Sequence, residues 1–146
     1  WGRPAPVRDG WFETGDAGLL NADGSIRILG RTSDMIITGG EKVVPTEVES
    51  ALESLPGIRE ALVLGMPDEK WGQIVTALLV SESAARPPVS GIVQGLAARL
   101  ARWKSPRRIA WVERLPLTAA GKRNRRPEVL KGLAFDVLHF RSAQPA

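Results

Sequence analysis

The sequence predicts an α+β fold, in which a β-hairpin precedes a small domain with a three-stranded sheet covered by helices. Two segments carry apolar residues at the i, i+3, i+4, i+7 spacing of helices, at 46–55 and 90–103. Three short, apolar, β-branched segments bounded by Pro, Gly or Asp predict strands at 58–64, 74–80 and 109–112. An Asp-Gly pair between two apolar runs near the N-terminus predicts the hairpin. Helices interspersed with strands in this order are expected to cover one sheet.

The predicted hairpin spans residues 17–29. Two leucines precede the turn sequence Asn-Ala-Asp-Gly at 21–24, and the alternating Ser-Ile-Arg-Ile follows at 25–28. A two-stranded hairpin is only marginally stable alone in water, so we expect this piece to belong to a larger sheet. Residues 1–32 are therefore predicted to end a preceding domain, and the start at Trp1 without Met or signal peptide predicts a fragment.

The second predicted unit runs from 33 to 133. Its first helix begins with Thr-Glu-Val-Glu from Thr46, which fits a capping box, and a Pro-Gly pair ends it. Asn124 is expected to cap a last helix over 125–132. The tail, 134–146, is predicted to be flexible.

Composition excludes several functional classes. The chain has 146 residues, 43% apolar and 25% charged, which is typical of a globular domain. No apolar run approaches the roughly 18 residues of a membrane span. The absence of Cys excludes disulfides and thiolate sites, and it fits a reducing compartment such as the cytoplasm. The single histidine, His139, lies near the predicted flexible tail, so neither a histidine zinc site nor a Ser-His-Asp triad is expected, and no metal site is predicted.

Charge is distributed unevenly along the chain. Residues 1–98 hold 8 Lys/Arg and 13 Asp/Glu, a net charge of −5, whereas residues 99–131 hold 11 against 2, a net charge of +9. A basic block of this kind attracts polyanions. A nucleic-acid-binding module is therefore one alternative function, and an ordinary solvated basic face is another.

Three motifs together resemble the AMP-forming adenylating superfamily, which contains acyl-CoA synthetases, adenylation domains of peptide synthetases, and luciferases. They are Gly-Trp-Phe-Glu-Thr-Gly-Asp at 10–16, Gly-Arg-Thr-Ser-Asp-Met-Ile-Ile-Thr-Gly-Gly-Glu at 30–41, and Leu-Pro-Leu-Thr-Ala-Ala-Gly-Lys at 115–122. The resemblance covers nearly all of the chain and corresponds to the C-terminal third of such enzymes. It implies that residues 1–32 end the N-terminal adenylating domain, and that residues 33–133 form a mobile lid domain.

Asp16 and Arg31 are the predicted nucleotide-binding residues. A carboxylate can accept hydrogen bonds from both hydroxyls of a vicinal diol, and the resemblance implies that Asp16 binds the ribose of ATP. Arg31 offers a guanidinium that suits ribose or phosphate oxygens, and the resemblance implies that it contacts the nucleotide. Without the flanking motif, an aspartate after glycine is more often a simple turn cap.

Lys122 is the predicted catalytic residue. A mobile ammonium can stabilise negative charge that develops on an α-phosphate and on leaving pyrophosphate, and the resemblance implies this role in adenylation. The basic block alone would suggest an ordinary solvated lysine. The resemblance also places a hinge between domains at Ser33 and Asp34. The family commonly has Asp or Lys where this chain has Ser33, which leaves the pivot open.

The predicted CoA-binding residues form two groups. The pair Gly39 and Gly40 lets backbone approach a thin ligand closely, and the resemblance implies that it lines the pantetheine tunnel. A tight turn is the alternative for any Gly-Gly pair. A second group lies at 102–108, where a tryptophan stands among basic residues. This cluster is expected to hold the nucleotide end of CoA through Trp103, Lys104 and Arg107. Core packing is the alternative for that tryptophan, and Trp71 is interpreted as structural.

The resemblance implies an ATP-dependent acid–thiol ligase, an acyl-CoA synthetase that joins a carboxylic acid to CoA through acyl-AMP. An o-succinylbenzoate–CoA ligase, a fatty-acid ligase and an aryl ligase remain open as its particular type. An adenylation domain that loads a carrier protein in trans is the alternative within the same class. ATP and Mg²⁺ are expected to be held mainly by the N-terminal domain, a homo-oligomer is left open, and the chain alone is predicted to be inactive.

Overall fold

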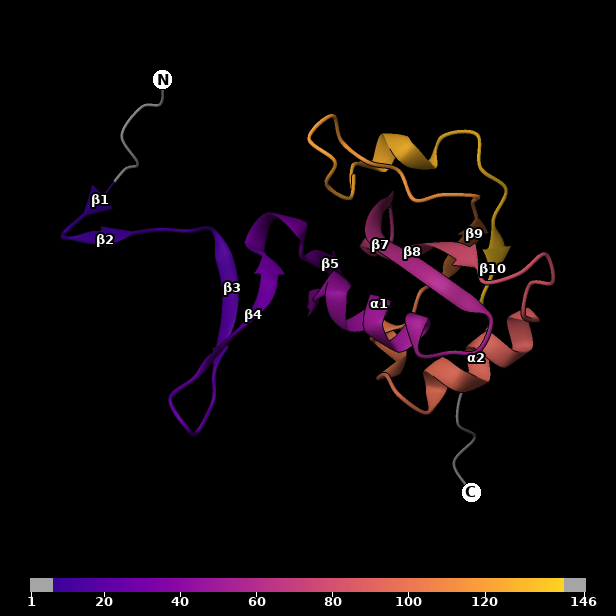
Figure 1. Cartoon of the computed structure of the whole chain (residues 1–146), viewed down its shortest axis with the longest axis horizontal. Coiled ribbons are helices and arrows are strands. Elements are labelled where there is room, and N and C mark those ends of the chain that lie inside the picture. The colour runs from indigo at the N-terminus through magenta and orange to yellow at the C-terminus, as the bar shows by residue number, and fades with distance from the viewer. Residues whose placement is uncertain (1–6, 141–146) are drawn as a thin grey trace.

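The computed structural model describes residues 7–140 (Figure 1). Its strands and helices follow one another as β1 (Val7–Arg8), β2 (Trp11–Phe12), β3 (Asp16–Leu20), β4 (Ile26–Arg31), β5 (Ile36–Thr38), β6 (Glu41–Val43), α1 (Pro45–Glu53), β7 (Ile58–Asp68), β8 (Gly72–Ser81), α2 (Val89–Ala97), β9 (Arg108–Trp111) and β10 (Asp136–Val137). Three turns of 3-10 helix complete it, η1 (Thr32–Asp34), η2 (Arg102–Lys104) and η3 (Pro127–Leu130). The β1–β2 hairpin lies apart from the six-stranded sheet, whereas β4 of the second hairpin lies beside α1. We call the described chain from β5 onward the C-terminal domain. The α+β class is confirmed.

Strands β3 and β4 form the predicted hairpin. Gly24, at φ +83°, makes the turn possible, and the Asn21 N–H closes it by donating to the Ser25 carbonyl at 2.9 Å. The hydroxyl and the N–H of Ser25 both donate to Asp23, which holds the pKa of that carboxyl below its ordinary value. The apolar side chains of the hairpin remain exposed, as Leu20 at 71% illustrates.

The sheet of the C-terminal domain is built around β8. This strand pairs antiparallel with β7 and parallel with β9. These are the three predicted strands, and each is present. The sheet is nevertheless six-stranded, because β10 adds to β9, β5 pairs with the start of β8, and β6 pairs with β5. The added strands have only two or three residues, too few to show a period-two pattern in the sequence.

Each face of the sheet carries its own core. Alternate residues of β8 point to opposite faces, so Val75 and Leu79 pack beneath α1 and α2 while Leu78 and Val80 pack on the other side. The second face is covered by the segment 115–135, which includes η3. Helices therefore cover only one face, and an extended segment covers the other.

Three predicted helix features are wrong in detail. The second helix, predicted over 90–103, ends at Ala97 as α2, and η2 follows it as a separate turn. Thr46 does not cap α1, because the helix begins at Pro45 and the Thr46 hydroxyl donates instead to the Leu29 carbonyl at 2.7 Å. The last helix is only the short turn η3, since a proline at 127 favours extended backbone at Arg126, which has φ −71° and ψ 137°. Asn124 still accepts a hydrogen bond from the Arg126 N–H at 3.1 Å.

The predicted tail joins the sheet over its described part. Strand β10 pairs with β9, and Leu138 is 5% exposed with its N–H donating to the Arg107 carbonyl at 3.0 Å. The edge of β9 would otherwise present unpaired backbone groups, and the apolar Leu138 completes the core beneath the helices. Residues 141–146 lie outside the described chain. Over residues 7–140, no helix is both long and apolar enough to span a membrane.

Candidate functional site

Asp16 and Arg31 face each other across β3 and β4. The Arg31 guanidinium donates to the Asp16 carboxylate at 3.0 Å and to the Thr14 carbonyl at 2.7 Å. Gly15 has φ +72°, and a Cβ at this glycine would lie 3.2 Å from the guanidinium, so the motif needs glycine here. The structure therefore brings the two predicted nucleotide-binding residues together on an exposed edge.

The predicted hinge is the exposed turn η1. The Thr32 N–H donates to the Gly15 carbonyl at 2.9 Å, which attaches the start of the turn to the hairpin. Asp34 lies 3.5 Å from Arg125, which attaches the end of the turn to the C-terminal domain. Ser33 lies between these two attachments, and its hydroxyl donates to Asp34 at 3.2 Å. No residue of η1 is buried, so the described structure does not hold this segment inside a core.

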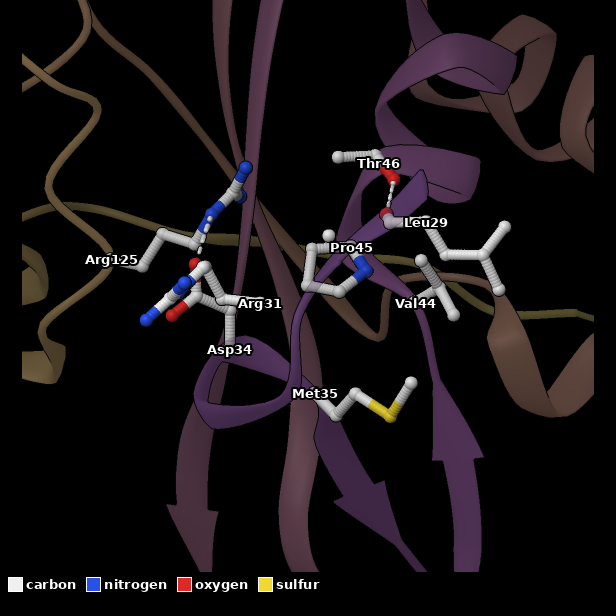
Figure 2. A pocket seen from close by; sticks show the side chains of 9 residues that line it. Leu29, Arg31, Asp34, Met35, Val44, Pro45, Thr46 and Arg125 are labelled. Carbon is white, nitrogen blue, oxygen red and sulfur yellow. Dashed lines mark hydrogen bonds and ion pairs between the residues drawn. The ribbon is translucent and has the colours of Figure 1, made fainter. Parts of the chain in front are cut away.

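The cleft beside η1 separates the hairpin from the C-terminal domain (Figure 2). Leu29 and Arg31 line it from the hairpin, and Pro45, Thr46 and Arg125 line it from the C-terminal domain. The hydrogen bond from Thr46 to Leu29 spans the cleft. A rotation at the hinge would have to break this contact.

Gly39 and Gly40 form the tight turn between β5 and β6. The Gly39 N–H donates to the Trp71 carbonyl at 2.9 Å, and a Cβ on Gly39 would come within 2.8 Å of the Trp71 ring. Gly40 differs, because a Cβ there would meet nothing within 4 Å. Gly39 is thus required by the neighbouring indole, whereas Gly40 leaves open space beside its backbone.

Lys122 lies in a tight loop that is closed by a bridge between Leu117 and Arg123. The Thr118 N–H donates to the Lys122 carbonyl at 2.7 Å, and the Lys122 N–H donates to the Thr118 hydroxyl at 3.2 Å. Gly121 turns the chain at φ +74°. The backbone of Lys122 is therefore held in place while its side chain stays exposed.

Trp103 and Arg107 line one depression, together with Lys70, Trp71, Arg102, Ser105, Arg108 and His139. The Arg107 guanidinium lies over the Trp71 ring, 4.3 Å from its centroid. Lys104 does not line this depression and instead binds Glu47 on α1 at 2.6 Å. The Ser105 hydroxyl is buried without a hydrogen-bond partner in the described structure. We call this group the basic depression.

The loop of Lys122 borders a different depression. That depression is lined by Thr118 and Arg123 from the loop, by Ser33 and Asp34 from the hinge, and by Gln73 from β8. It shares no lining residue with the basic depression. The lysine loop and the indole that contacts Gly39 therefore belong to different surface depressions of the C-terminal domain.

The family of AMP-binding enzyme C-terminal domains matches residues 47–122 of the chain, which is more than half of it. The chain belongs to this family. The match begins within α1 and ends at Lys122, so it includes Trp71, Trp103 and Arg107 of the basic depression but not His139.

Relatives of this AMP-binding C-terminal domain are longer enzymes. The chain is 42% identical over 126 residues to the long-chain-fatty-acid–CoA ligase FadD13 of Mycobacterium tuberculosis, covering 84% of the chain and 25% of the ligase. It is 39% identical over 130 residues to a fatty acid–[acyl-carrier-protein] ligase, ScoC, of Streptomyces coeruleorubidus. That match covers 86% of the chain and 25% of the ligase. Among solved structures, the chain superposes on o-succinylbenzoate CoA synthetase of Bacillus subtilis in complex with its acyl-adenylate, with a TM-score of 0.77 at 39% identity. The match covers 86% of this chain and 25% of the synthetase. The chain thus spans about a quarter of each relative's length.

Several residues of this domain were missed because their partners come from distant segments. Trp71 is interpreted as structural from the sequence, and it joins the Gly39 turn to Arg107. At least three of the eleven basic residues of the block at 99–131 are paired with carboxylates, since Lys104 binds Glu47 and both Arg123 and Arg125 bind Glu49. The nucleic-acid-binding alternative for the block stays a prediction.

Proposed function

We propose that this chain is the C-terminal part of an ATP-dependent, AMP-forming acid–thiol ligase, with the lid domain carrying two alternative active-site surfaces. The observation that carries the proposal is that the Lys122 loop borders one depression, whereas Trp71, whose ring contacts Gly39, lines another with no lining residue in common. An exposed hinge turn joins these surfaces to the nucleotide-binding hairpin. Such an arrangement suits an enzyme that presents one surface for each half-reaction.

In the first half-reaction, a carboxylate oxygen attacks the α-phosphorus of ATP, and pyrophosphate leaves with the bonding electron pair. Asp16 and Arg31 hold the ribose and fix the position of the α-phosphate. The Lys122 ammonium stabilises the charge that develops on the α-phosphate oxygens and the departing pyrophosphate. Mg²⁺ arrives with ATP, and residues 7–140 contain no cluster of three acidic or histidine side chains to hold it.

In the second half-reaction, rotation at Ser33 and Asp34 replaces the lysine surface with the diglycine surface. A thiolate attacks the acyl carbonyl, and AMP leaves with the electron pair of the acyl–phosphate bond. The open backbone of Gly40 admits the pantetheine arm. Trp103 and Arg107 in the basic depression receive the nucleotide end of CoA. A contact from Lys104 requires that it first release Glu47.

We propose a chemical class for the acid substrate and another for the thiol that accepts the acyl group. Relatives include ligases for long-chain fatty acids and for 2-succinylbenzoate, and we propose that the acid is one of these or an aryl acid. The carrier-protein ligase among the relatives makes a carrier thiol the second candidate acceptor. We favour CoA, because aromatic and cationic side chains together line the basic depression. A cytoplasmic location and a homo-oligomer remain predictions.

The proposed reaction is tested with the full-length protein. Incubation with ATP, Mg²⁺, hydroxylamine and a panel of fatty, aryl and 2-succinylbenzoic acids should give an acyl hydroxamate, AMP and pyrophosphate. Replacing hydroxylamine with CoA or with a carrier protein then identifies the acceptor. Acid-dependent release of ADP and phosphate would contradict the proposal. The 146-residue chain alone should form no acyl-AMP.

A further inference from the structure

The outer edge of β7 is covered by side chains and not by another described strand. Two of its N–H groups are accepted by carboxylates of α1: Ala61 donates to Glu53 at 3.0 Å, and Val63 donates to Glu49 at 2.8 Å. Side chains therefore perform the pairing that a neighbouring strand would otherwise provide at this edge.

The carbonyl groups of the same edge are bound from the segment that follows Lys122. Arg123 donates to the Ala61 carbonyl at 3.0 Å, and Arg125 donates to the Val63 carbonyl at 2.7 Å. Both arginines also bind the Glu49 carboxylate. Arg123 reaches it at 3.2 Å, and Arg125 contacts both of its oxygens. We call Glu49, Arg123 and Arg125 the edge clamp.

The clamp is centred on a buried charge. The Glu49 side chain is 4% exposed, compared with 16% for Arg125 and 38% for Arg123. A carboxylate this deeply buried is costly unless it is paired, and here two guanidiniums and one backbone N–H satisfy it. The clamp therefore fixes the direction of the segment 123–125 more strongly than exposed ion pairs would.

This segment is the C-terminal leg of the lysine loop. Arg123 directly follows Lys122, and the next residue, Asn124, donates its N–H to the Pro116 carbonyl at 2.9 Å. Arg125 extends the connection to the hinge through Asp34, at 3.5 Å (Figure 2). One cluster thus joins the hinge turn, α1, the edge strand and the base of the loop that carries the proposed catalytic ammonium.

We propose that Glu49 is a positioning residue for adenylation, which acts through Arg123 and Arg125 to place the Lys122 loop relative to the hinge. The inference rests on the proposed function of Lys122. Glu49 has its own partners on every side and is 4% exposed, so it acts on the reaction only through them. If the clamp is lost, rotation at the hinge still turns the domain, but it no longer delivers the lysine to a fixed place.

The test uses the full-length enzyme with Glu49→Gln, which keeps the size and one acceptor oxygen but removes the charge. We expect adenylation, measured as acid-dependent pyrophosphate exchange, to fall at least about tenfold, because small displacements of a catalytic group cost that much or more. Thioester formation from supplied acyl-AMP should change by less than about twofold, since it does not use Lys122. Glu60→Gln is the matched control, because Glu60 lies on β7, the strand whose edge the clamp binds, in an exposed pair with Arg59.

A double-mutant cycle separates positioning from general damage. In a Lys122→Ala background, Glu49→Gln should have no further effect on adenylation, because its contribution passes through the lysine. Additive losses, or equal losses in both half-reactions of Glu49→Gln, would overturn the positioning role.

If circular dichroism shows that Glu49→Gln folds poorly, Arg123→Lys replaces it with the same expectations, since the Arg123 side chain is 38% exposed and the substitution keeps the charge. If Lys122→Ala itself affects both half-reactions equally, the proposed function fails. If Lys122→Ala behaves as expected but Glu49→Gln leaves adenylation unchanged, the positioning role alone fails.

Discussion

The Lys122 loop and the Gly39–Gly40 turn are both short Gly-containing turns, but the molecule holds them by different means. The lysine loop is held at its base by charged groups, where Arg123 reaches the buried Glu49 at 3.2 Å. The diglycine turn is held by backbone and packing, through a 2.9 Å hydrogen bond to the Trp71 carbonyl and contact with the Trp71 ring. The first can tolerate a changed side chain at its tip, whereas the second leaves no room even for a methyl group at Gly39.

This difference matches the chemistry proposed for each turn. A group that stabilises developing charge needs a long, exposed side chain on a firmly held backbone, and Lys122 has both. A surface that guides a thin thiol arm needs backbone without side chains, and Gly40 offers open space. Substitutions should therefore affect activity alone at the lysine and should affect folding at the diglycine.

The largest effect is expected for Lys122→Ala. Adenylation by the full-length enzyme should fall about 100-fold or more, because one preorganised charge-stabilising group is lost. Conversion of supplied acyl-AMP to thioester should survive, and the thermal midpoint should hardly change because the side chain is exposed. Separate assays of the two half-reactions check this, with Lys131→Ala as an exposed lysine control. Equal loss in both assays would remove the distinction between the two turns.

Gly39→Ala should come next, with an effect on stability. The residue has φ +58°, and its new methyl group would lie 2.8 Å from the Trp71 ring, so we expect a loss of about 2 kcal/mol from backbone and packing strain together. Urea unfolding of the chain followed by fluorescence measures it. Adding Trp71→Leu should recover the packing part, and a double mutant with no such recovery would show that the indole does not set this requirement.

Gly40→Ala should cost less, about 1 kcal/mol. Its φ of +86° penalises any side chain, but nothing lies within 4 Å of the added methyl group. Thioester formation should nevertheless slow, because the methyl group occupies the space proposed for pantetheine. Comparison of the unfolding midpoint with the thioester rate separates these effects. A stability loss as large as that of Gly39→Ala would show that the two glycines are not distinct.

The smallest effect is expected for Thr46→Val, which removes the hydrogen bond across the cleft without changing the side-chain shape. The loss should be about 1 kcal/mol or less, because the bond is a single neutral one. The substitution should also change the ratio of the two half-reaction rates, since this hydrogen bond must break when the hinge rotates. Ser50→Ala removes another hydroxyl from α1, one that bonds within the helix, and should leave the ratio unchanged.

Local patterns predicted most of the elements of this protein. The helix periodicity over 46–55, the β-branched runs of β7, β8 and β9, and the Asp-Gly turn of the hairpin each reflect a repeat that the residues themselves carry. The sequence also indicated Asp16 and Arg31 individually as nucleotide-binding residues, and the structure shows that they contact each other. These features depend on residues that are close together in the sequence, including the contiguous motifs.

Only the tertiary structure decided the rest. Strand β10 exists because β9 offers it an edge, and Thr46 bonds Leu29 because the hairpin lies beside α1. The edge clamp joins Glu49 to arginines more than 70 residues away, and Lys104 joins Glu47 in the same way. Such charge pairs have no period and no fixed spacing, because they depend on which surfaces the packed cores bring together. The sequence thus determined most of the longer elements and the groups proposed to react, and the packing decided which side chains hold them in place.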